Sequence, residues 1–222
     1  MRPWFRGILL TTGLLLATAL EAQAQREVVF NEIMIRRSGA NPTVDQLVEL
    51  KNTGGFSIDV SGWVFCHQFD YSATIPNGTT IPAGGILTCH FNQSGSNTSS
   101  DVYFSGEVLT TTSDLGLYIN DNGFSVPANM HAFIQFGGVP STGRQSVAAS
   151  AGLWTTNAFI ANPTAGSSVE LCLADATQVS SWVATSSATI GTSNGCGVAT
   201  KEVSWGSVKS IFGRNNKGLR IH

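Results

Sequence analysis

The chain has 222 residues, and only 12% of them are charged, about half the share of roughly 25% that is usual in soluble domains. Its formal net charge of −2 argues against nucleic acid as the partner of the whole domain. A hydrophobic share of 42% and 24 glycines suit a turn-rich β protein better than a helical or disordered one.

The first 24 residues have the pattern of a cleavable signal peptide. MRPWFR is basic, and GILLTTGLLLATAL is an apolar run of 14 residues, shorter than the roughly 20 that span a bilayer. The small residues Ala22 and Ala24 predict cleavage after Ala24; the alternative is a retained membrane anchor. We therefore expect a secreted, periplasmic or cell-surface protein whose mature chain has no transmembrane segment.

The mature chain is expected to divide into one β domain, residues 26–197, and a tail, residues 198–222. Residues 201–222 carry a net charge of +4, whereas residues 25–200 carry −7. The tail is therefore electrostatically separate from the domain.

Short strands separated by turn residues succeed one another from residue 27 onward, which predicts an all-β sandwich or barrel. VVFNEIMI is the first expected strand, and LVELK alternates apolar and polar positions. Gly54 and Gly55 are expected to break that strand by adopting positive φ. FSIDV resumes the alternation before the chain turns at Gly62.

Later segments continue the pattern. TTIPAGGILTCHF is expected to turn at Gly84 and Gly85 before a strand, and Asn122–Gly123 to form a tight hairpin turn. Residues 143–152 predict one short helix that stops at Gly152. HAFIQFGG, SSVELCLAD and SSWVATSSATIGTSNG supply the remaining β segments.

The four cysteines, Cys66, Cys89, Cys172 and Cys196, are an even number in a chain expected to be exported, so disulfides are expected. Three pairings are possible. The favoured pairing joins Cys66 to Cys89 and Cys172 to Cys196, because each bridge would close a short loop between strands that are expected to be neighbours. Each would stabilise the fold by roughly 3 kcal/mol.

The order of these features resembles the lamin tail domain family, as found in exported bacterial proteins. The matching positions are Asn31, Glu32 and Ile33; Glu49, Leu50 and Asn52; Asp59, Ser61, Gly62 and Trp63; and Pro82, Ala83, Gly84 and Gly85. The resemblance implies an immunoglobulin-like β-sandwich. It also implies a binding or architectural unit, with these residues serving structure.

Two catalytic or metal-binding patterns have simpler explanations. Gly191–Gly195 fits G-x-S-x-G around Ser193, but a nucleophile elbow requires a strand before the serine and a helix after it. Cys66, His67, Cys89 and His90 invite a zinc site. Adjacent residues on a strand point to opposite faces, so a disulfide and two surface histidines are favoured, and no metal or cofactor is predicted.

Carboxylates are the remaining candidates for acid–base chemistry or calcium binding. Glu32, Glu49, Asp59 and Asp70 are not spaced as a ligand loop. Asp59 is expected to act as a turn residue. The two glutamates are expected to bond neighbouring backbone or to pair with Arg36, Arg37 or Lys51.

Other polar and aromatic residues are also expected to serve structure. Arg144, after the Gly-rich GGVPSTGR, is expected to anchor its loop against an acidic neighbour rather than to bind a phosphate. Trp63, Trp154 and Trp182 are expected in or near the core; exposed beside Tyr71 or Tyr103, they would instead form a glycan platform.

The tail has helical spacing of apolar residues from about Ser204, which predicts a short amphipathic helix. It is expected to dock on the sandwich, or to contact an anionic polymer, a membrane or a partner. The candidate contact residues are Trp205, Lys209, Phe212, Arg214, Lys217 and Arg220.

These features together predict an exported, non-enzymatic binding or structural module at the cell envelope or outside the cell. Its partner would be an unidentified protein or cell-surface polymer. The alternative is an accessory subunit, or a weak hydrolase, that works with a separately encoded enzyme.

Overall fold

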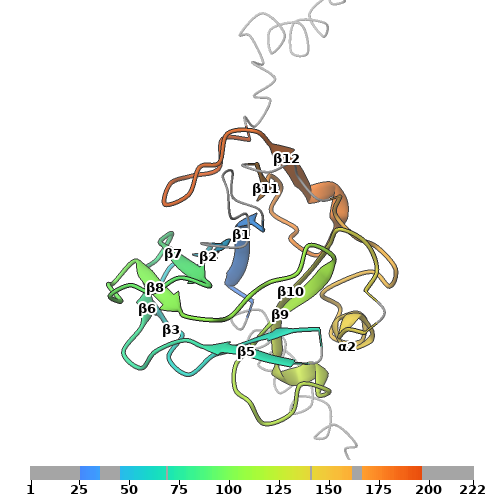
Figure 1. Ribbon diagram of the computed structural model, residues 1–222, viewed down its shortest axis with the longest axis horizontal. Helices are drawn as coiled ribbons and strands as arrows, with labels where there is room; N and C mark the ends of the chain where they lie inside the picture. Colours follow the sequence, from blue (N-terminus) through green and yellow to red (C-terminus); the bar gives the residue numbers. More distant parts are fainter. Residues whose placement is uncertain (1–25, 36–45, 69, 141, 162–166, 197–222) are drawn as a thin grey trace, which may run out of the picture.

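The computed structural model describes residues 26–35, 46–68, 70–140, 142–161 and 167–196. Two sheets account for most of it (Figure 1). The larger sheet has the strand order β12 (Trp182–Thr185), β11 (Ser168–Leu171), β1 (Val28–Met34), β2 (Gln46–Asn52), β7 (Ile86–Phe91) and β8 (Asp101–Phe104). The paired strands are antiparallel except β7 and β8, which are parallel.

The smaller sheet faces the first and has the order β10 (Met130–Phe136), β9 (Ser113–Tyr118), β4 (Val64–His67) and β5 (Asp70–Thr74). A two-stranded piece, β3 (Ile58–Asp59) with β6 (Thr80–Ile81), closes one corner. The helical elements are η1 (Pro127–Asn129), α2 (Gln145–Ser150) and η2 (Val179–Ser181). The predicted all-β, immunoglobulin-like sandwich with one short helix is confirmed.

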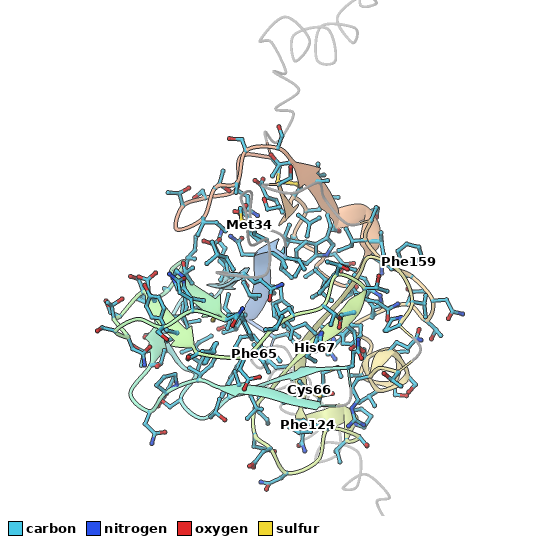
Figure 2. The ribbon with its side chains drawn as sticks, in the orientation of Figure 1. Met34, Phe65, Cys66, His67, Phe124 and Phe159 are labelled. Carbon is cyan, nitrogen blue, oxygen red and sulfur yellow. A yellow bond between two sulfur atoms is a disulfide. The ribbon has the colours of Figure 1, made fainter. Side chains whose placement is uncertain are left out.

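Aromatic side chains join the two sheets at the centre. Phe65 of β4 contacts three rings of the larger sheet, with centroids 5.3 Å from Phe91, 5.8 Å from Phe104 and 6.4 Å from Phe30. All four side chains are buried, and each contributes roughly 1.5–3 kcal/mol by leaving water. Figure 2 labels Phe65 within this layer.

A β-bulge in β1 determines which of its residues face this core. Phe30 pairs with Leu50, but Glu32 pairs with Glu49, so Asn31 is the extra residue. Strict alternation from Phe30 would direct Glu32 into the core. The bulge instead directs Ile33 inward and leaves Glu32 on the outer face of the sheet.

The corner between β2 and β4 has the turn chemistry that the sequence predicted. Asp59 Oδ1 accepts the Ser61 amide at 2.9 Å, and Ser61 Oγ accepts the amides of Gly78 and Thr79. The bonds from Ser61 to Asp59 lower the pKa of the Asp59 carboxyl. Gly62 has φ +73°, which explains why glycine stands between Ser61 and the next strand.

The turn at Gly84 and Gly85 and the turn at Gly54 and Gly55 have different backbone conformations. Gly84 has φ +68°, and the Gly85 amide donates to the Pro82 carbonyl, as expected of the IPAGG turn. The predicted break of the strand at Gly54 and Gly55 is confirmed, since β2 ends at Asn52, but neither glycine adopts positive φ.

Asn52 holds the turn after β2 through its side chain. Its amide nitrogen donates to the carbonyls of Phe56 and Ile81, and its oxygen accepts the Gly54 amide. A buried side chain rather than a special backbone conformation therefore determines this turn.

The helix prediction is confirmed by α2, with Gly152 at φ +69° just beyond it. The predicted tight hairpin at Asn122–Gly123 is wrong in its length. β9 and β10 do pair, but residues 119–129 connect them and include η1. Of the described residues, none belongs to a helix long and apolar enough to cross a membrane.

The two predicted disulfides have different outcomes. Cys172 and Cys196 form one, with an S–S distance of 2.08 Å and Cα atoms 5.5 Å apart. The Cys66–Cys89 bridge is wrong, because both residues remain thiols. They lie on β4 and β7, in opposite sheets, and not on the neighbouring strands that the pairing assumed.

Candidate functional site: a carboxylate row under the closing loop

Three buried glutamates lie side by side on the outer face of the larger sheet. Glu32 of β1 is in register with Glu170 of β11 on one side and with Glu49 of β2 on the other. Their exposed fractions are 0% for Glu32 and Glu49 and 2% for Glu170. We call these three residues the carboxylate row. Like charges directly opposite on neighbouring strands repel, so the row requires partners.

The closing loop, residues 186–196, supplies those partners. The Thr189 amide donates to both oxygens of Glu32, at 3.0 and 3.1 Å, and its hydroxyl lies 2.8 Å from Glu32 Oε2. The Gly191 amide donates to Glu49 Oε1, and the Cys196 amide donates to Glu170 Oε2 at 3.2 Å. Each glutamate therefore accepts a backbone N–H from the same loop.

Two asparagines fix the orientation of the donors at Glu49. Asn194 Nδ2 donates to the carbonyls of Asn31 and Leu171, so Asn194 Oδ1 faces Asn31 Nδ2 and accepts from it at 2.8 Å. The second hydrogen of Asn31 Nδ2 is then directed to Glu49 Oε2, also at 2.8 Å. Both oxygens of Glu49 thus face N–H donors, which is the environment of a carboxylate anion.

Glu170 has a different environment. Thr189 Oγ1 lies 2.8 Å from Glu32 Oε2 and 3.3 Å from Glu170 Oε1. A hydroxyl has one hydrogen, so it donates to only one carboxylate, and the shorter contact is to Glu32. The second contact is satisfied when Glu170 is protonated and donates to Thr189 Oγ1. We infer a chain of two hydrogen bonds, in which Glu170 donates to Thr189 Oγ1 and the Thr189 hydroxyl donates to Glu32.

Burial raises the pKa values of Glu49 and Glu170 above the ordinary value for glutamate. The charge on Glu32 raises both further, whereas the hydrogen bonds from the closing loop lower them. The hydrogen bonds therefore offset part of the effect of burial at both carboxyls.

The Cys172–Cys196 disulfide fastens the end of the closing loop to the strand that carries Glu170. Within the described part of the chain, one group of side chains lies close enough together to hold a metal ion. It consists of Glu170, Cys172 and Cys196, whose ligand atoms lie within 4.8 Å of one another. The sulfurs there are bonded to each other and are not thiolates, which are the form of cysteine that binds metals. The geometry therefore fits a covalent anchor for the loop.

The zinc interpretation of Cys66, His67, Cys89 and His90 is not supported. His67 Nε2 contacts Thr110 Oγ1 at 3.2 Å, and His90 contacts Asp101 at 3.1 Å. Burial, followed by the charges of Glu49 and Asp101, raises the pKa of the Cys89 thiol well above its usual value. Figure 2 shows Cys66 and His67 in succession on β4.

Ser193 lies in the exposed part of the closing loop, with no strand directly before it and no helix after it in the described residues. The nucleophile-elbow geometry is therefore absent at this position. Asp70 begins β5, on the other sheet, away from the carboxylate row.

Arg144 has the acidic neighbour that was predicted, although the bond involves its backbone. Asp114 of β9 accepts the amides of Arg144 and Gln68. Burial raises the pKa of Asp114 from 3.8 to about 6, and these two bonds and the Arg144 charge lower it in part. Asp114 connects β4 and the start of α2 to β9.

The tryptophans mostly serve the core. Trp154 is 5% exposed and Trp182 is 6% exposed, so an exposed glycan platform is not built from them. Trp63 is half-buried and packs against the core, with its ring centroid 4.4 Å from that of His131. The predicted contact residues of the tail, Trp205, Lys209, Phe212, Arg214, Lys217 and Arg220, lie outside the described residues.

Sequence reasoning identified two members of the carboxylate row and missed Glu170. A signal was present: the tripeptide Val-Glu-Leu occurs at residues 48–50 and again at residues 169–171. In both copies the valine is buried in the core. A glutamate flanked by inward-facing aliphatic residues on two strands indicates that both carboxylates lie on one outer face.

One family model matches most of the chain. The model of the Lamin Tail Domain family matches residues 21–186. No curated protein matches the chain. The family is one of immunoglobulin-like structural domains and is not an enzyme family. The chain belongs to the lamin tail domain family.

Proposed function

We propose that the protein is an exported, non-enzymatic binding or structural module that acts at the cell envelope or outside the cell. Its proposed partner is a protein or a cell-surface polymer, and the basic tail, residues 198–222, is a proposed contact. Family membership supports the module, because the matched family consists of immunoglobulin-like structural domains.

The observation that carries the proposal is how the carboxylate row is used. A hydrolase built on paired carboxylates presents them to substrate, so at least one oxygen of each must be accessible. Here the three glutamates are at most 2% exposed and bond the closing loop. The most concentrated acidic group of the described residues therefore serves to hold the fold closed.

Two features support export. Residues 1–24 have the charge and hydropathy pattern of a cleavable leader. The Cys172–Cys196 disulfide closes a loop between residues 24 positions apart, and such bridges persist in oxidising compartments.

The export half of the proposal is tested by fractionating bacterial cells that produce the full chain. We expect a product that lacks residues 1–24 and lies outside the cytoplasm. After denaturation, a thiol reagent should modify only two of its four cysteines. An intact leader on a cytoplasmic protein with four reactive thiols would overturn this half.

The binding half is tested by sedimentation of the mature chain with purified envelope material, compared with a chain that ends at Gly197. We expect saturable retention of the mature chain that weakens at least tenfold without the tail. Equal, unsaturable retention of both chains would refute the proposed role of the tail. Retention of neither chain would refute binding at the envelope.

A further inference from the structure

The chain contains three asparagine–glycine pairs, Asn77–Gly78, Asn122–Gly123 and Asn194–Gly195. In such a pair the backbone nitrogen of the glycine can lose its proton and bond to the asparagine Cγ, while Nδ2 leaves as ammonia. Water then opens the resulting succinimide ring at either carbonyl, which gives aspartate or isoaspartate. Glycine favours the reaction because it has no Cβ to obstruct the ring. The three pairs share this chemistry, so their folded environments determine which one reacts.

The pair at Asn77–Gly78, between β5 and β6, is held by the corner that Ser61 organises. The Gly78 amide donates to Ser61 Oγ at 2.9 Å, and the same hydroxyl oxygen accepts the Thr79 amide at 3.2 Å. Loss of the Gly78 proton would break the first bond, and the nitrogen would have to turn from Ser61 toward the Asn77 side chain. A residue of the family pattern therefore protects this pair.

The pair at Asn194–Gly195, in the closing loop, is protected at both reacting groups. Asn194 Nδ2 donates to the carbonyls of Asn31 and Leu171, and Asn194 Oδ1 accepts from Asn31 Nδ2. The Gly195 amide donates to the Glu170 carboxyl. The leaving group and the attacking nitrogen are thus both bonded to other parts of the domain, and the Asn194 side chain would lose three hydrogen bonds by turning toward Gly195.

The pair at Asn122–Gly123 lies on the connection between β9 and β10, where Asn122 is exposed. The contacts of this turn use other groups: the Asn122 amide donates to Asn120 Oδ1, and Asn129 Nδ2 lies 3.4 Å from the carbonyl oxygens of residues 122 and 123. Within the described ranges, neither the Asn122 side chain nor the Gly123 amide makes a hydrogen bond. The leaving group and the attacking nitrogen therefore break no protein contact when they react.

We propose that Asn122 is a self-modification site, at which the folded protein forms aspartate and isoaspartate with water as the co-reactant, and that the fold protects Asn77 and Asn194. Either product adds a negative charge beside Asp121 on an exposed turn. Isoaspartate also routes the backbone through Cβ, between the two carbonyls that Asn129 contacts. This site goes beyond the proposed module function and is independent of export, of the tail and of any partner.

Peptide mapping by mass spectrometry tests the proposal, after incubation of the mature, oxidised protein at mildly alkaline pH. Asn122 should convert roughly tenfold faster than Asn77 or Asn194, because the other two pairs must first lose hydrogen bonds. Conversion of Asn77 or Asn194 as fast as that of Asn122 would overturn the proposal. Conversion of Asn122 only after unfolding would overturn it too.

Incubation in urea with reductant is the control, because it removes the three folded environments while leaving the sequence unchanged. All three asparagines should then convert at similar rates. If Asn122 remains as strongly favoured in urea as in the folded chain, the local sequence determines the selectivity and the argument from the fold is overturned.

A pair of serine variants isolates one protecting contact. Ser61→Ala removes the acceptor of the Gly78 amide, so Asn77 should convert several-fold faster than in the wild type while Asn122 keeps its rate. The matched control Ser57→Ala, at an exposed position of the preceding turn, should change none of the rates. An unchanged rate at Asn77 in folded Ser61→Ala would overturn the protection by Ser61. If Ser61→Ala does not fold, the comparison of the three sites in the folded wild type decides the proposal.

Discussion

Two glutamine substitutions each replace one carboxyl of the carboxylate row with an amide but differ in the donors that each side chain meets. Glu49 faces N–H donors at both oxygens, from Gly191 and Asn31. A glutamine in its place has one oxygen, so its amide group would face the other N–H. Glu170 accepts the backbone amides of Cys196 and Gly195, and its Oε1 meets Thr189 Oγ1. A glutamine in place of Glu170 keeps an oxygen that accepts backbone amides, and its NH₂ replaces the carboxyl O–H toward Thr189.

The expected magnitudes derive from these contacts. A hydrogen bond to a charged group contributes about 1.5–3 kcal/mol, and a buried donor left without an acceptor costs about 1–3 kcal/mol. Relief of repulsion with Glu32 offsets part of the loss. We expect Glu49→Gln to lower the free energy of unfolding by about 2 kcal/mol, or about 4–8 °C in Tm, and Glu170→Gln not to lower it.

The assay is urea unfolding of the mature, oxidised chain at pH 7.5, followed by tryptophan fluorescence. Both variants lose one potential negative charge, so each is the control for the other. The reasoning about donors is refuted if Glu170→Gln costs as much as Glu49→Gln. An unchanged free energy of unfolding for Glu49→Gln would show that this carboxylate does not hold the closing loop.

The pH dependence provides a second check on Glu170. Its folded-state pKa is raised, so the stability that its protonated form contributes is complete below the unfolded pKa near 4.5. That stability is lost as pH rises through the folded pKa. The free energy of unfolding of Glu170→Gln should therefore rise relative to that of the wild type as pH increases from 4.5 to 8. If the two free energies change in parallel with pH, Glu170 is not neutral.

Three further perturbations test other parts of the fold. Reduction of Cys172–Cys196 should remove about 3 kcal/mol of stability, and an unchanged Tm in calorimetry with and without reductant would contradict this. Because the pKa of Asp114 is raised to about 6, the wild type should lose about 2–3 kcal/mol of unfolding free energy relative to Asp114→Asn as pH rises from 4 to 7. Chemical unfolding at several pH values measures this difference, and a difference that stays constant with pH would contradict it. Gly62→Ala, at φ +73°, should cost about 1–2 kcal/mol in urea unfolding, whereas Gly55→Ala, at an exposed position with open space for a Cβ, should cost less; equal losses would refute the backbone argument.

Local turn chemistry was the most predictable part of this fold. Asp59, Ser61 and Gly62 act within a few residues of one another, so a short stretch of sequence contains the whole reason for the corner. Asn52 was identified from the sequence as a position of the family pattern that serves structure. Its bond to the Ile81 carbonyl was not predictable, because that partner lies 29 residues away.

The cysteine pairing shows how a local argument fails. Cys66 and Cys89 each have apolar neighbours on their own strand, which is compatible with a shared disulfide in one sheet. The chain instead places β4 and β7 in opposite sheets, and both side chains enter the core from different sides. Sheet membership depends on pairings across the whole domain, which alternation within one strand does not report.

The bulge at Asn31 links the predictable and the unpredictable parts of the candidate site. In β1 the core-facing residues are Val28, Phe30 and Ile33, so their spacing changes from two to three. That change marks where the register shifts, and it is visible in the sequence. The shift moves Glu32 outward to join Glu49 and Glu170, and it releases Asn31 to meet Asn194. The sequence does not contain the reason these carboxylates tolerate burial, since each accepts a backbone amide of a loop that lies about 140 to 160 residues beyond Glu32 and Glu49 and 26 residues beyond Glu170 at Cys196. Backbone donors carry no side-chain signature, so a site satisfied in this way becomes visible only when the loop is placed on the sheet.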